Sequence, residues 1–353
     1  MIKLLIVDDS ALMRRQMASL FESAGGFDVR QARNGKEAVA ENLAFQPDVV
    51  TLDINMPEMD GLTALSVIMT ERPVPVVMVS SLTEQGALAT LEALAMGAVD
   101  YIPKPGGTIS LSLAEIERDL IAKVRAAARS RLRRPSIRSA PVARPPQRPR
   151  PVPRTAAPSG AGDGLVLIGV STGGPRTLEE ILPLLPADFR WPVLVAQHMP
   201  GAFTKSFAER LDRICALEVC EVSTPQALVA GKVHVARGGA DMVVARRGNA
   251  LYALPRPESA QHIWHPSVEL LARSALAHCP ARALVAVMLT GMGNDGADGF
   301  AEIARRGGRT IAESEETTVV NGMPRELVER GGATLVLPAH RIADQLREWA
   351  EAA

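Results

Sequence analysis

An arginine- and proline-rich segment divides this chain into two parts that must fold separately. Between Arg129 and Gly162 the sequence carries nine arginines and eight prolines but no acidic residue. Proline lacks a backbone donor and is excluded from helix interiors, so this composition favours extended chain over a packed core. We therefore expect one domain over residues 1–125, a flexible linker over 126–163, and a second domain over 164–353. A basic tail that contacts acidic partners is a second interpretation of the linker, and it stays open.

Composition limits the compartment and the partners. Hydrophobic residues make up 47% of the chain, and 39 basic residues balance 39 acidic ones. No net field attracts nucleic acid or an anionic membrane, so we expect neither as a partner. The cysteines (Cys215, Cys220 and Cys279) form no C-x-x-C pair, which indicates reduced, buried thiols rather than a disulfide frame or a zinc site. The apolar start is too short for a signal peptide, and no later run is long enough to insert into a membrane. We expect a cytoplasmic protein.

Short apolar runs alternate with amphipathic stretches in both parts. The strand-like runs are Leu4–Val7, Val49–Leu52, Val76–Val79, Val99–Ile102, Leu165–Val170, Val193–Gln197 and Leu284–Leu289. Repeated strand–helix alternation is typical of parallel sheets covered by helices. It predicts an α/β fold for both domains: a doubly wound sheet in the first, and a second parallel sheet interrupted by a β-rich stretch at about 217–253.

Charged and polar residues stand at the ends of the predicted strands of the first domain. They are Asp8, Asp9, Asp53, Ser80 and Lys104. Ligands of such sheets bind at the carboxyl ends of the strands. Clustered carboxylates repel one another unless a cation lies among them, and Mg²⁺ suits this donor set. Asp53 is then placed to accept a phosphoryl group, with Ser80 and Lys104 beside it. Taken singly, the first two aspartates can also be helix caps and the lysine a loop charge.

These residues resemble the receiver domains of response regulators. The matching motifs are V-D-D-S at 7–10, L-D-I-N-M-P at 52–57, D-G at 60–61, V-S at 79–80 and K-P at 104–105. The resemblance covers residues 1–125 and implies a five-stranded, flavodoxin-like parallel sheet. It also implies phosphoryl transfer from a histidine kinase to Asp53. The implied Mg²⁺ ligands are Asp8, Asp9, Asp53 and the backbone of Asn55, and the implied switch residues are Ser80, Tyr101 and Lys104. Simple packing is the alternative role for Tyr101.

A glycine-flanked serine follows the first predicted strand of the second domain. In G-V-S-T-G-G at 169–174, glycines allow a sharp turn that exposes Ser171 at the strand end. The next helix N-terminus offers N–H groups to a developing oxyanion. A phosphate cradle is a rival interpretation, although neither G-x-G-x-x-G nor G-x-x-x-x-G-K-[ST] is present. A plain tight turn is another.

Two further residues follow later strands of the same domain. His198 comes directly after the run at 193–197, where a general base for Ser171 would be needed. Asp295 lies in the glycine-rich loop at 289–296 and can orient the imidazole, or it can simply cap a helix. The chain order Ser, His, Asp differs from the Ser, Asp, His order of α/β-hydrolases, so the G-x-S-x-G match does not make this domain a lipase.

The second domain resembles the catalytic domain of the chemotaxis protein-glutamate methylesterases. The matching stretches are G-V-S-T-G-G-P (169–175), Q-H-M-P (197–200), H-P-S-V (265–268), L-T-G-M-G-N-D-G (289–296) and N-G-M-P-R-E (321–326). The resemblance implies a triad of Ser171, His198 and Asp295, with backbone oxyanion donors at Thr172 and Met292 and no esterase cofactor. It further implies hydrolysis of glutamate methyl esters and of glutamines on chemoreceptors. The unphosphorylated receiver is expected to block this site.

Two other classes of function compete with this interpretation. One is a transcription factor, which the second domain opposes because it lacks a basic recognition helix and far exceeds a helix-turn-helix module in size. The other is a phosphorylation-dependent adaptor with an inactive hydrolase fold. Labelling of Ser171 by a serine-reactive probe separates the adaptor from the enzyme.

Overall fold

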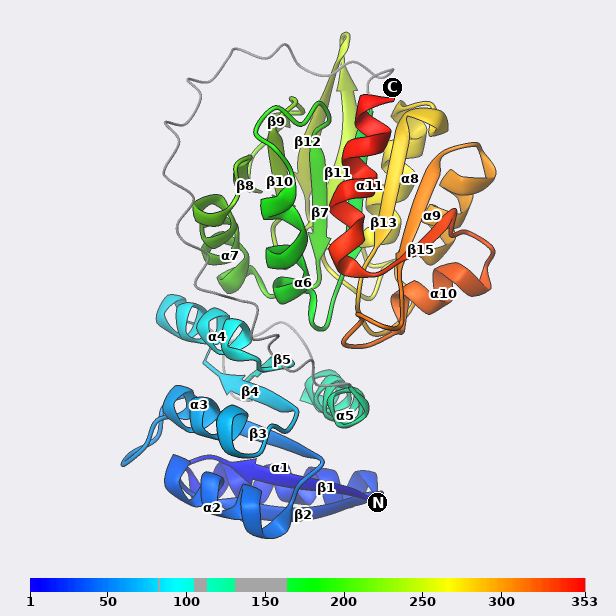
Figure 1. Ribbon diagram of the computed structural model, residues 1–353. Coiled ribbons are helices and arrows are strands. Elements are labelled where there is room, and N and C mark those ends of the chain that lie inside the picture. The colour runs from blue at the N-terminus through cyan, green and yellow to red at the C-terminus, as the bar shows by residue number, and fades with distance from the viewer. Residues whose placement is uncertain (82, 105–112, 131–163, 353) are drawn as a thin grey trace. The chain divides into compact units, whose positions relative to one another are not determined.

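The computed structural model describes residues 1–81, 83–104, 113–130 and 164–352 (Figure 1). The chain folds into two compact units, Met1–Arg138 and Ser139–Ala353. Residues 126–129 of the predicted linker belong instead to the helix Leu113–Arg129, in which Ala127 is buried, and residues 131–163 lie outside the described residues.

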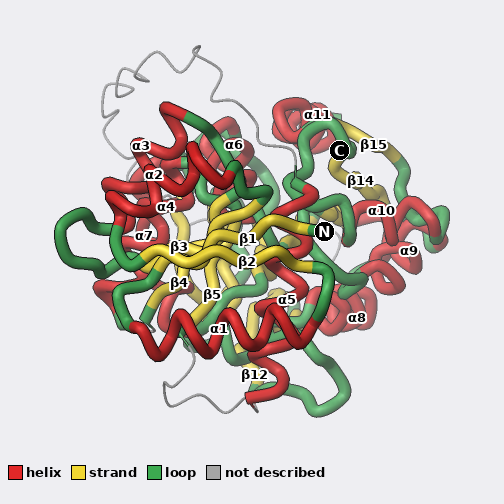
Figure 2. The backbone as a smooth tube through the Cα atoms, turned by 90° about the horizontal axis from the view of Figure 1, so that it is seen from below, coloured by secondary structure: helices red, strands yellow, loops and turns green. Residues whose placement is uncertain are grey.

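The first unit is a five-stranded parallel sheet covered by helices on both faces. Its strands lie in the order β2-β1-β3-β4-β5. They are β1 (Ile2–Val7), β2 (Phe27–Ala32), β3 (Val49–Asp53), β4 (Val76–Ser80) and β5 (Asp100–Pro103). The helices are α1 (Ala11–Ala24), α2 (Gly35–Phe45), α3 (Gly61–Glu71), α4 (Glu84–Met96) and α5 (Leu113–Arg129). Figure 2 shows α1 and α5 on one side of this sheet and α2, α3 and α4 on the other. The predicted flavodoxin-like order is confirmed.

The helices of the first unit begin where the sequence supplies a side-chain cap. An oxygen at each N-cap accepts a hydrogen bond from an N–H group of the first turn: Ser10 for α1, Asn34 for α2, Asp60 for α3 and Thr83 for α4. A cap of this kind stabilises a helix by about 1 kcal/mol. Each cap fixes the residue at which a helix begins, and therefore the length of the loop between the preceding strand and that helix.

The second unit contains a seven-stranded parallel sheet in the order β15-β14-β13-β6-β7-β10-β8. Its strands are β6 (Leu165–Val170), β7 (Val193–Gln197), β8 (Glu218–Val222), β10 (Lys232–Ala236), β13 (Leu284–Met288), β14 (Arg309–Glu313) and β15 (Leu335–Leu337). A separate antiparallel sheet is formed by β9 (Gln226–Ala227), β11 (Asp241–Arg247) and β12 (Ala250–Arg256). The predicted parallel sheet is confirmed, and the β-rich stretch divides itself between the two sheets.

Helices cover the large sheet of the second unit. They are α6 (Gly174–Ile181), α7 (Gly201–Ile214), α8 (Val268–His278), α9 (Ala297–Arg305), α10 (Met323–Glu329) and α11 (Ala339–Glu351). Helices α6 and α11 lie side by side, and α8 packs against α9 and β11 (Figure 1).

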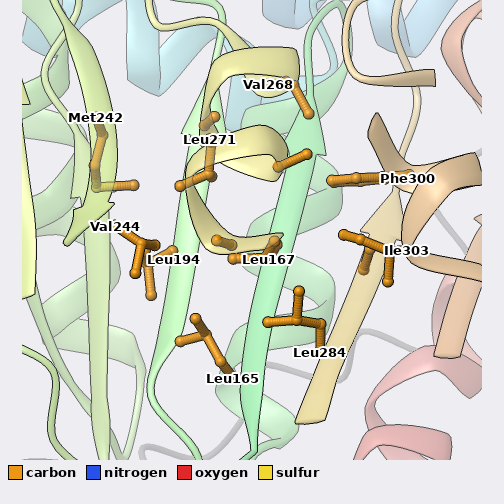
Figure 3. Close-up of a cluster of buried hydrophobic side chains, with 14 of the residues drawn as sticks. Leu165, Leu167, Leu194, Met242, Val244, Val268, Leu271, Leu284, Phe300 and Ile303 are labelled. Carbon is orange, nitrogen blue, oxygen red and sulfur yellow. The ribbon is translucent and has the colours of Figure 1, made fainter. Parts of the chain in front are cut away.

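The aliphatic core between the sheet and α8 positions the functional loops. Side chains of β6, β7, β11 and β13 meet those of α8 and α9 in one buried cluster (Figure 3). The labelled members are Leu165, Leu167, Leu194, Met242, Val244, Val268, Leu271, Leu284, Phe300 and Ile303. Burial of a side chain of this size stabilises a fold by about 1.5–3 kcal/mol. This packing holds the start of α8 over the carboxyl ends of the central strands.

The cysteines are free thiols, as expected from their spacing. Cys279 is buried, whereas Cys215 and Cys220 are only partly buried. Burial raises the pKa of Cys215 to about 12 and that of Cys279 to about 11, so both stay protonated at neutral pH. Among the described helices, none combines the length and the apolar character that a membrane crossing needs.

Candidate functional sites

The three predicted residues of the second unit follow neighbouring strands. Strand β6 lies between β7 and β13, so the chain reverses its direction of strand addition there. Ser171 directly follows β6, His198 directly follows β7, and Asp295 lies in the loop after β13. The carboxyl ends of parallel strands at such a reversal form the usual ligand crevice of an open α/β sheet.

Ser171 is held by its backbone rather than by its side chain. Its N–H donates to the carbonyl of Thr290 at 3.0 Å, and its carbonyl accepts from the side-chain amide of Gln197 at 3.0 Å. Gly173 then takes a left-handed φ of 79° before α6 begins. The hydroxyl-bearing carbon is thus fixed at the strand end, while the residue stays partly exposed.

His198 and Asp295 form a hydrogen-bonded pair. The distance from the ring Nε2 to Oδ2 of Asp295 is 2.9 Å. An ionised carboxylate can only accept hydrogen bonds, so Nε2 carries the proton and donates it. The other ring nitrogen, Nδ1, keeps its lone pair, and it is buried without a hydrogen-bond partner in the described part of the chain. Nδ1 is therefore the nitrogen of this ring that can accept a proton.

Asp295 is held at the N-terminus of α8. Its carboxylate accepts hydrogen bonds from the Val268 N–H at 2.6 Å, the Glu269 N–H at 3.0 Å and the Ser267 hydroxyl at 3.1 Å. Burial by itself would raise the pKa of Asp295. The hydrogen bond and charge of His198, with the two N–H groups, outweigh burial and lower that pKa below its usual range. The carboxylate is therefore ionised throughout the neutral range.

Asp295 does bond the N-terminus of a helix, but this helix is not the one that follows it in the chain. The helix that follows it, α9, has Gly296 at its N-cap and no side-chain cap bond. Asp295 lies instead at the start of α8, 27 residues earlier in the chain, where helix N-termini favour negative charge. The carboxylate lies beside His198, as the sequence predicts, but the sequence did not indicate which helix would hold it.

The predicted oxyanion donors flank Ser171. Thr172 follows Ser171 in the chain, and the loop with Met292 packs directly against it. A Cβ atom at Gly291 would lie 2.7 Å from the Cβ of Ser171, so only glycine permits this approach. The Thr290 hydroxyl ties the two loops together by donating to the Thr172 carbonyl at 2.9 Å. The assignment of the two N–H groups as oxyanion donors stays a prediction.

One predicted contact is not formed. Among the described residues, no hydrogen bond joins the Ser171 hydroxyl to the His198 ring. The two residues are nevertheless adjacent through their backbones, because the His198 N–H donates to the Val170 carbonyl at 3.1 Å. Catalytic hydrogen bonds of this kind are often formed only when substrate is bound.

The carboxylates of the first unit also converge. One oxygen from each of Asp8, Asp9 and Asp53 lies within 4.8 Å of the others. The ammonium of Lys104 lies 2.7 Å from Oδ2 of Asp53 and 3.4 Å from Oδ2 of Asp8. Asn55 contributes its N–H, which points to Asp53 at 3.4 Å. The structure therefore brings together the side chains of Asp8, Asp9, Asp53 and Lys104, four of the residues that the sequence predicts for this site.

The charge balance of this pocket fits a divalent cation. Burial raises the pKa of the Asp53 carboxyl above its usual range, the charge of Asp8 raises it further, and Lys104 only partly opposes this. In addition, Oδ2 of Asp8 is buried without a hydrogen bond from the described residues. A cation among these oxygens would relieve the repulsion and favour ionised Asp53, the form that can act as a nucleophile.

The two other switch residues make contacts within the first unit. The Ser80 hydroxyl lies within hydrogen-bond distance of the backbone carbonyls of Ser81 and Gly86, both at 3.3 Å. Tyr101 is buried, with the ammonium of Lys123 5.3 Å from its ring centre. A switch role for these two side chains stays a prediction.

Two residues around Ser171 and His198 were not singled out from the sequence. The buried amide of Gln197 donates to the carbonyls of both Ser171 and His198, each at 3.0 Å, and so joins the two loops. Ser267 caps α8 and donates to Asp295. The sequence offered a signal for each, since both lie in stretches that match the methylesterase motifs, Q-H-M-P and H-P-S-V.

Comparisons with known families match the two units separately. Residues 4–114 match the response regulator receiver domain, and residues 166–346 match the CheB methylesterase domain.

Individual relatives match over nearly the whole chain. A protein of Rhodospirillum rubrum named protein-glutamate methylesterase/protein-glutamine glutaminase 3 is 56% identical, over 99% of this chain and 96% of its own length. A protein of Rhodopseudomonas palustris with the same name, numbered 2, is 52% identical over 100% of this chain and 99% of its own length. Among solved structures, the catalytic domain of the Thermotoga maritima CheB methylesterase is 38% identical with a TM-score of 0.52, over 53% of this chain and 99% of that one.

Proposed function

Because this chain belongs to the CheB methylesterase family and carries a receiver domain before the methylesterase domain, we propose that it is a phosphorylation-activated protein-glutamate methylesterase and protein-glutamine glutaminase. Its substrates are methylated glutamates and glutamines of methyl-accepting chemoreceptors, and its role is sensory adaptation in the cytoplasm. The observation that carries this proposal is the buried His198–Asp295 pair beside Ser171, with one ring nitrogen still able to accept a proton.

The reaction proceeds through an acyl-enzyme. The Ser171 hydroxyl oxygen attacks the γ-carbonyl carbon of the methyl ester, and Nδ1 of His198 takes the hydroxyl proton. The imidazolium then gives this proton to the departing methoxide, which leaves as methanol. A water molecule, activated by the same ring, hydrolyses the acyl-enzyme to glutamate and free Ser171. Glutamine follows the same steps, with ammonia as the leaving group.

The groups around Ser171 support this reaction in different ways. Asp295 keeps the proton on Nε2 and stabilises the imidazolium. The N–H groups of Thr172 and Met292 stabilise the oxyanion, and such a donor is typically worth about 10²–10³-fold in rate. General base catalysis by His198 contributes about 10²–10⁴-fold. The esterase chemistry requires no cofactor in this scheme.

The receiver controls the esterase through its carboxylate pocket. Asp8, Asp9, Asp53 and the backbone of Asn55 hold Mg²⁺, which supplies positive charge for phosphoryl transfer from a chemotaxis histidine kinase to Asp53. Lys104 neutralises the phosphoryl oxygens, and Ser80 and Tyr101 rearrange. The unphosphorylated receiver blocks the esterase site. The proposed limits are 1–129 for the receiver domain, which includes the whole of α5, 130–163 for the linker and 164–353 for the catalytic domain.

We expect Asp53→Asn to abolish activation by a phosphodonor while leaving basal esterase activity intact. Asparagine cannot form the acyl phosphate, and position 53 belongs to the first unit, whereas Ser171, His198 and Asp295 belong to the second. The measurement is methanol release from methylated receptor membranes, with and without acetyl phosphate and Mg²⁺. Asp28→Asn, at an exposed position of β2, is the matched control and should respond like the wild type. A response of Asp53→Asn to acetyl phosphate would disprove the assignment.

Removal of the receiver should activate the esterase permanently. A protein that begins at Asp163 retains the whole seven-stranded sheet and its core, and the T. maritima catalytic domain was solved as a separate chain. We expect this protein to release methanol at about the rate of the phosphorylated full-length chain, with no response to acetyl phosphate. A tenfold activation corresponds to about 1.4 kcal/mol. A rate no higher than that of the unphosphorylated full-length chain would argue against a blocking receiver.

A further inference from the structure

The indole of Trp264 lies flat against the imidazole of His198. The two ring centres are 5.7 Å apart, and the ring planes differ by only 2°. Trp264 belongs to the loop between β12 and α8, so it approaches the ring from an element other than β7 or the Asp295 loop. Offset parallel packing of this kind is a favoured geometry for flat rings.

The bond to Asp295 does not fix the plane of the imidazole by itself. It holds the ring at a single atom, Nε2. The outer torsion of a histidine side chain is broad and roughly twofold, so the ring can turn while this hydrogen bond is kept. Because Nδ1 has no hydrogen-bond partner among the described residues, it does not resist the turn. A flat contact on the face of the ring does resist this rotation.

Trp264 is itself held in place from two directions. Its six-membered ring lies against Gly293, where a Cβ atom would come within 2.9 Å of Cζ2. The next residue, His265, anchors the loop, because its Nδ1 lies 3.1 Å from both carboxylate oxygens of Asp241. The Asp241 side chain is fully buried and also accepts from the Ser267 N–H at 2.8 Å. The same loop therefore carries the indole and the start of α8, which holds Asp295.

We propose that Trp264 is a positioning residue of the esterase. Its indole holds the plane of the His198 ring so that Nδ1 keeps the direction in which it takes the Ser171 proton. This inference rests on the proposed role of His198 as the general base. A misplacement of a reacting group by about 1 Å can cost about 10²-fold in rate, so loss of the stack should lower kcat and leave receptor binding intact.

The kinetic test compares Trp264→Leu with Trp264→Phe in the full-length protein activated by acetyl phosphate. For methanol release from methylated receptor membranes, we expect the leucine variant to lose about 10- to 100-fold in kcat with KM within about twofold. The phenylalanine variant, which can still stack, should recover most of the loss. Gln261→Ala, at an exposed position of the same loop, is the control and should match the wild type.

Three outcomes of this test would overturn the inference. They are an unchanged kcat in Trp264→Leu, a loss confined to KM, and a phenylalanine variant as slow as the leucine variant. His198→Ala separates this failure from failure of the proposed mechanism. If His198→Ala is inactive while Trp264→Leu is fully active, only the positioning role is wrong. If His198→Ala keeps full activity, the assignment of the general base is wrong.

Tryptophan emission supplies a readout that does not depend on turnover. The emission of Trp264 is taken as the difference between the wild type and Trp264→Phe, and it depends on what covers the face of the indole. His198→Ala removes the packed imidazole and should shift this difference spectrum, whereas Gln261→Ala should leave it unchanged. A difference spectrum that His198→Ala does not alter would contradict the stack.

Discussion

Replacing Ser171 by alanine should lower methanol release from methylated receptor by about 10⁴-fold or more. The loss of a nucleophile in a serine hydrolase is typically among the largest single effects, because the acyl-enzyme can no longer form. The fold should be unaffected, since Ser171 is fixed through its backbone N–H and carbonyl rather than through its hydroxyl. The measurement is the initial rate of methanol release with acetyl phosphate present.

The matched control for Ser171→Ala is Ser223→Ala, an exposed serine after β8. It should release methanol at the wild-type rate. A serine-reactive phosphonate should label the wild type and Ser223→Ala but not Ser171→Ala. Near-full activity of Ser171→Ala would exclude Ser171 as the nucleophile. A wild-type protein that is active but not labelled by the phosphonate would point to direct attack by water.

Asp295→Asn should lower kcat by about 10⁴-fold, through the tautomer of His198. An asparagine can turn its amide NH₂ toward Nε2, which then must accept rather than donate. The ring proton would move to Nδ1, and the nitrogen that has to take the Ser171 proton would already carry one. The remaining rate should come from the oxyanion donors and from substrate binding.

The control for this substitution is Asp298→Asn, three positions later on α9. Its carboxylate is mostly exposed and pairs with Arg330, so the change should leave kcat near the wild-type value. Surface ion pairs of this kind contribute about 1 kcal/mol or less to stability. A wild-type kcat in Asp295→Asn would show that this carboxylate does not govern the ring.

Local sequence patterns were sufficient for the fold and for placing the candidate residues of both sites at strand ends. Apolar runs such as Leu165–Val170 and Val193–Gln197 form strands with the predicted limits, because a fully buried parallel strand has to be apolar on both faces. Residues that directly follow parallel strands share one edge of the sheet, so Asp8 and Asp53 in one unit, and Ser171 and His198 in the other, were predicted to meet.

Hydrogen-bond directions could not be read from the sequence in the same way. Ser80 stands at the predicted strand end, but the pattern does not indicate that its hydroxyl lies 3.3 Å from the Gly86 carbonyl. This contact depends on how close the start of α4 comes to β4, and a cap at Thr83 sets only where that helix begins. Side-chain rotamers follow from the packing of neighbouring elements, which a strand pattern does not describe.

The sequence by itself determined two α/β domains and the residues at each strand end, and from these it predicted a phosphate-accepting carboxylate in one domain and a serine-centred site in the other. Only the tertiary structure decided that Asp295 lies on the N-terminus of α8, that it bonds Nε2 and leaves Nδ1 without a hydrogen-bond partner among the described residues, and that Trp264 packs on the ring. The physical reason is the sequence separation of the residues in contact. Strand ends follow from the periodicity of neighbouring residues, whereas these contacts join segments that meet only after the loop before α8 has packed over the sheet.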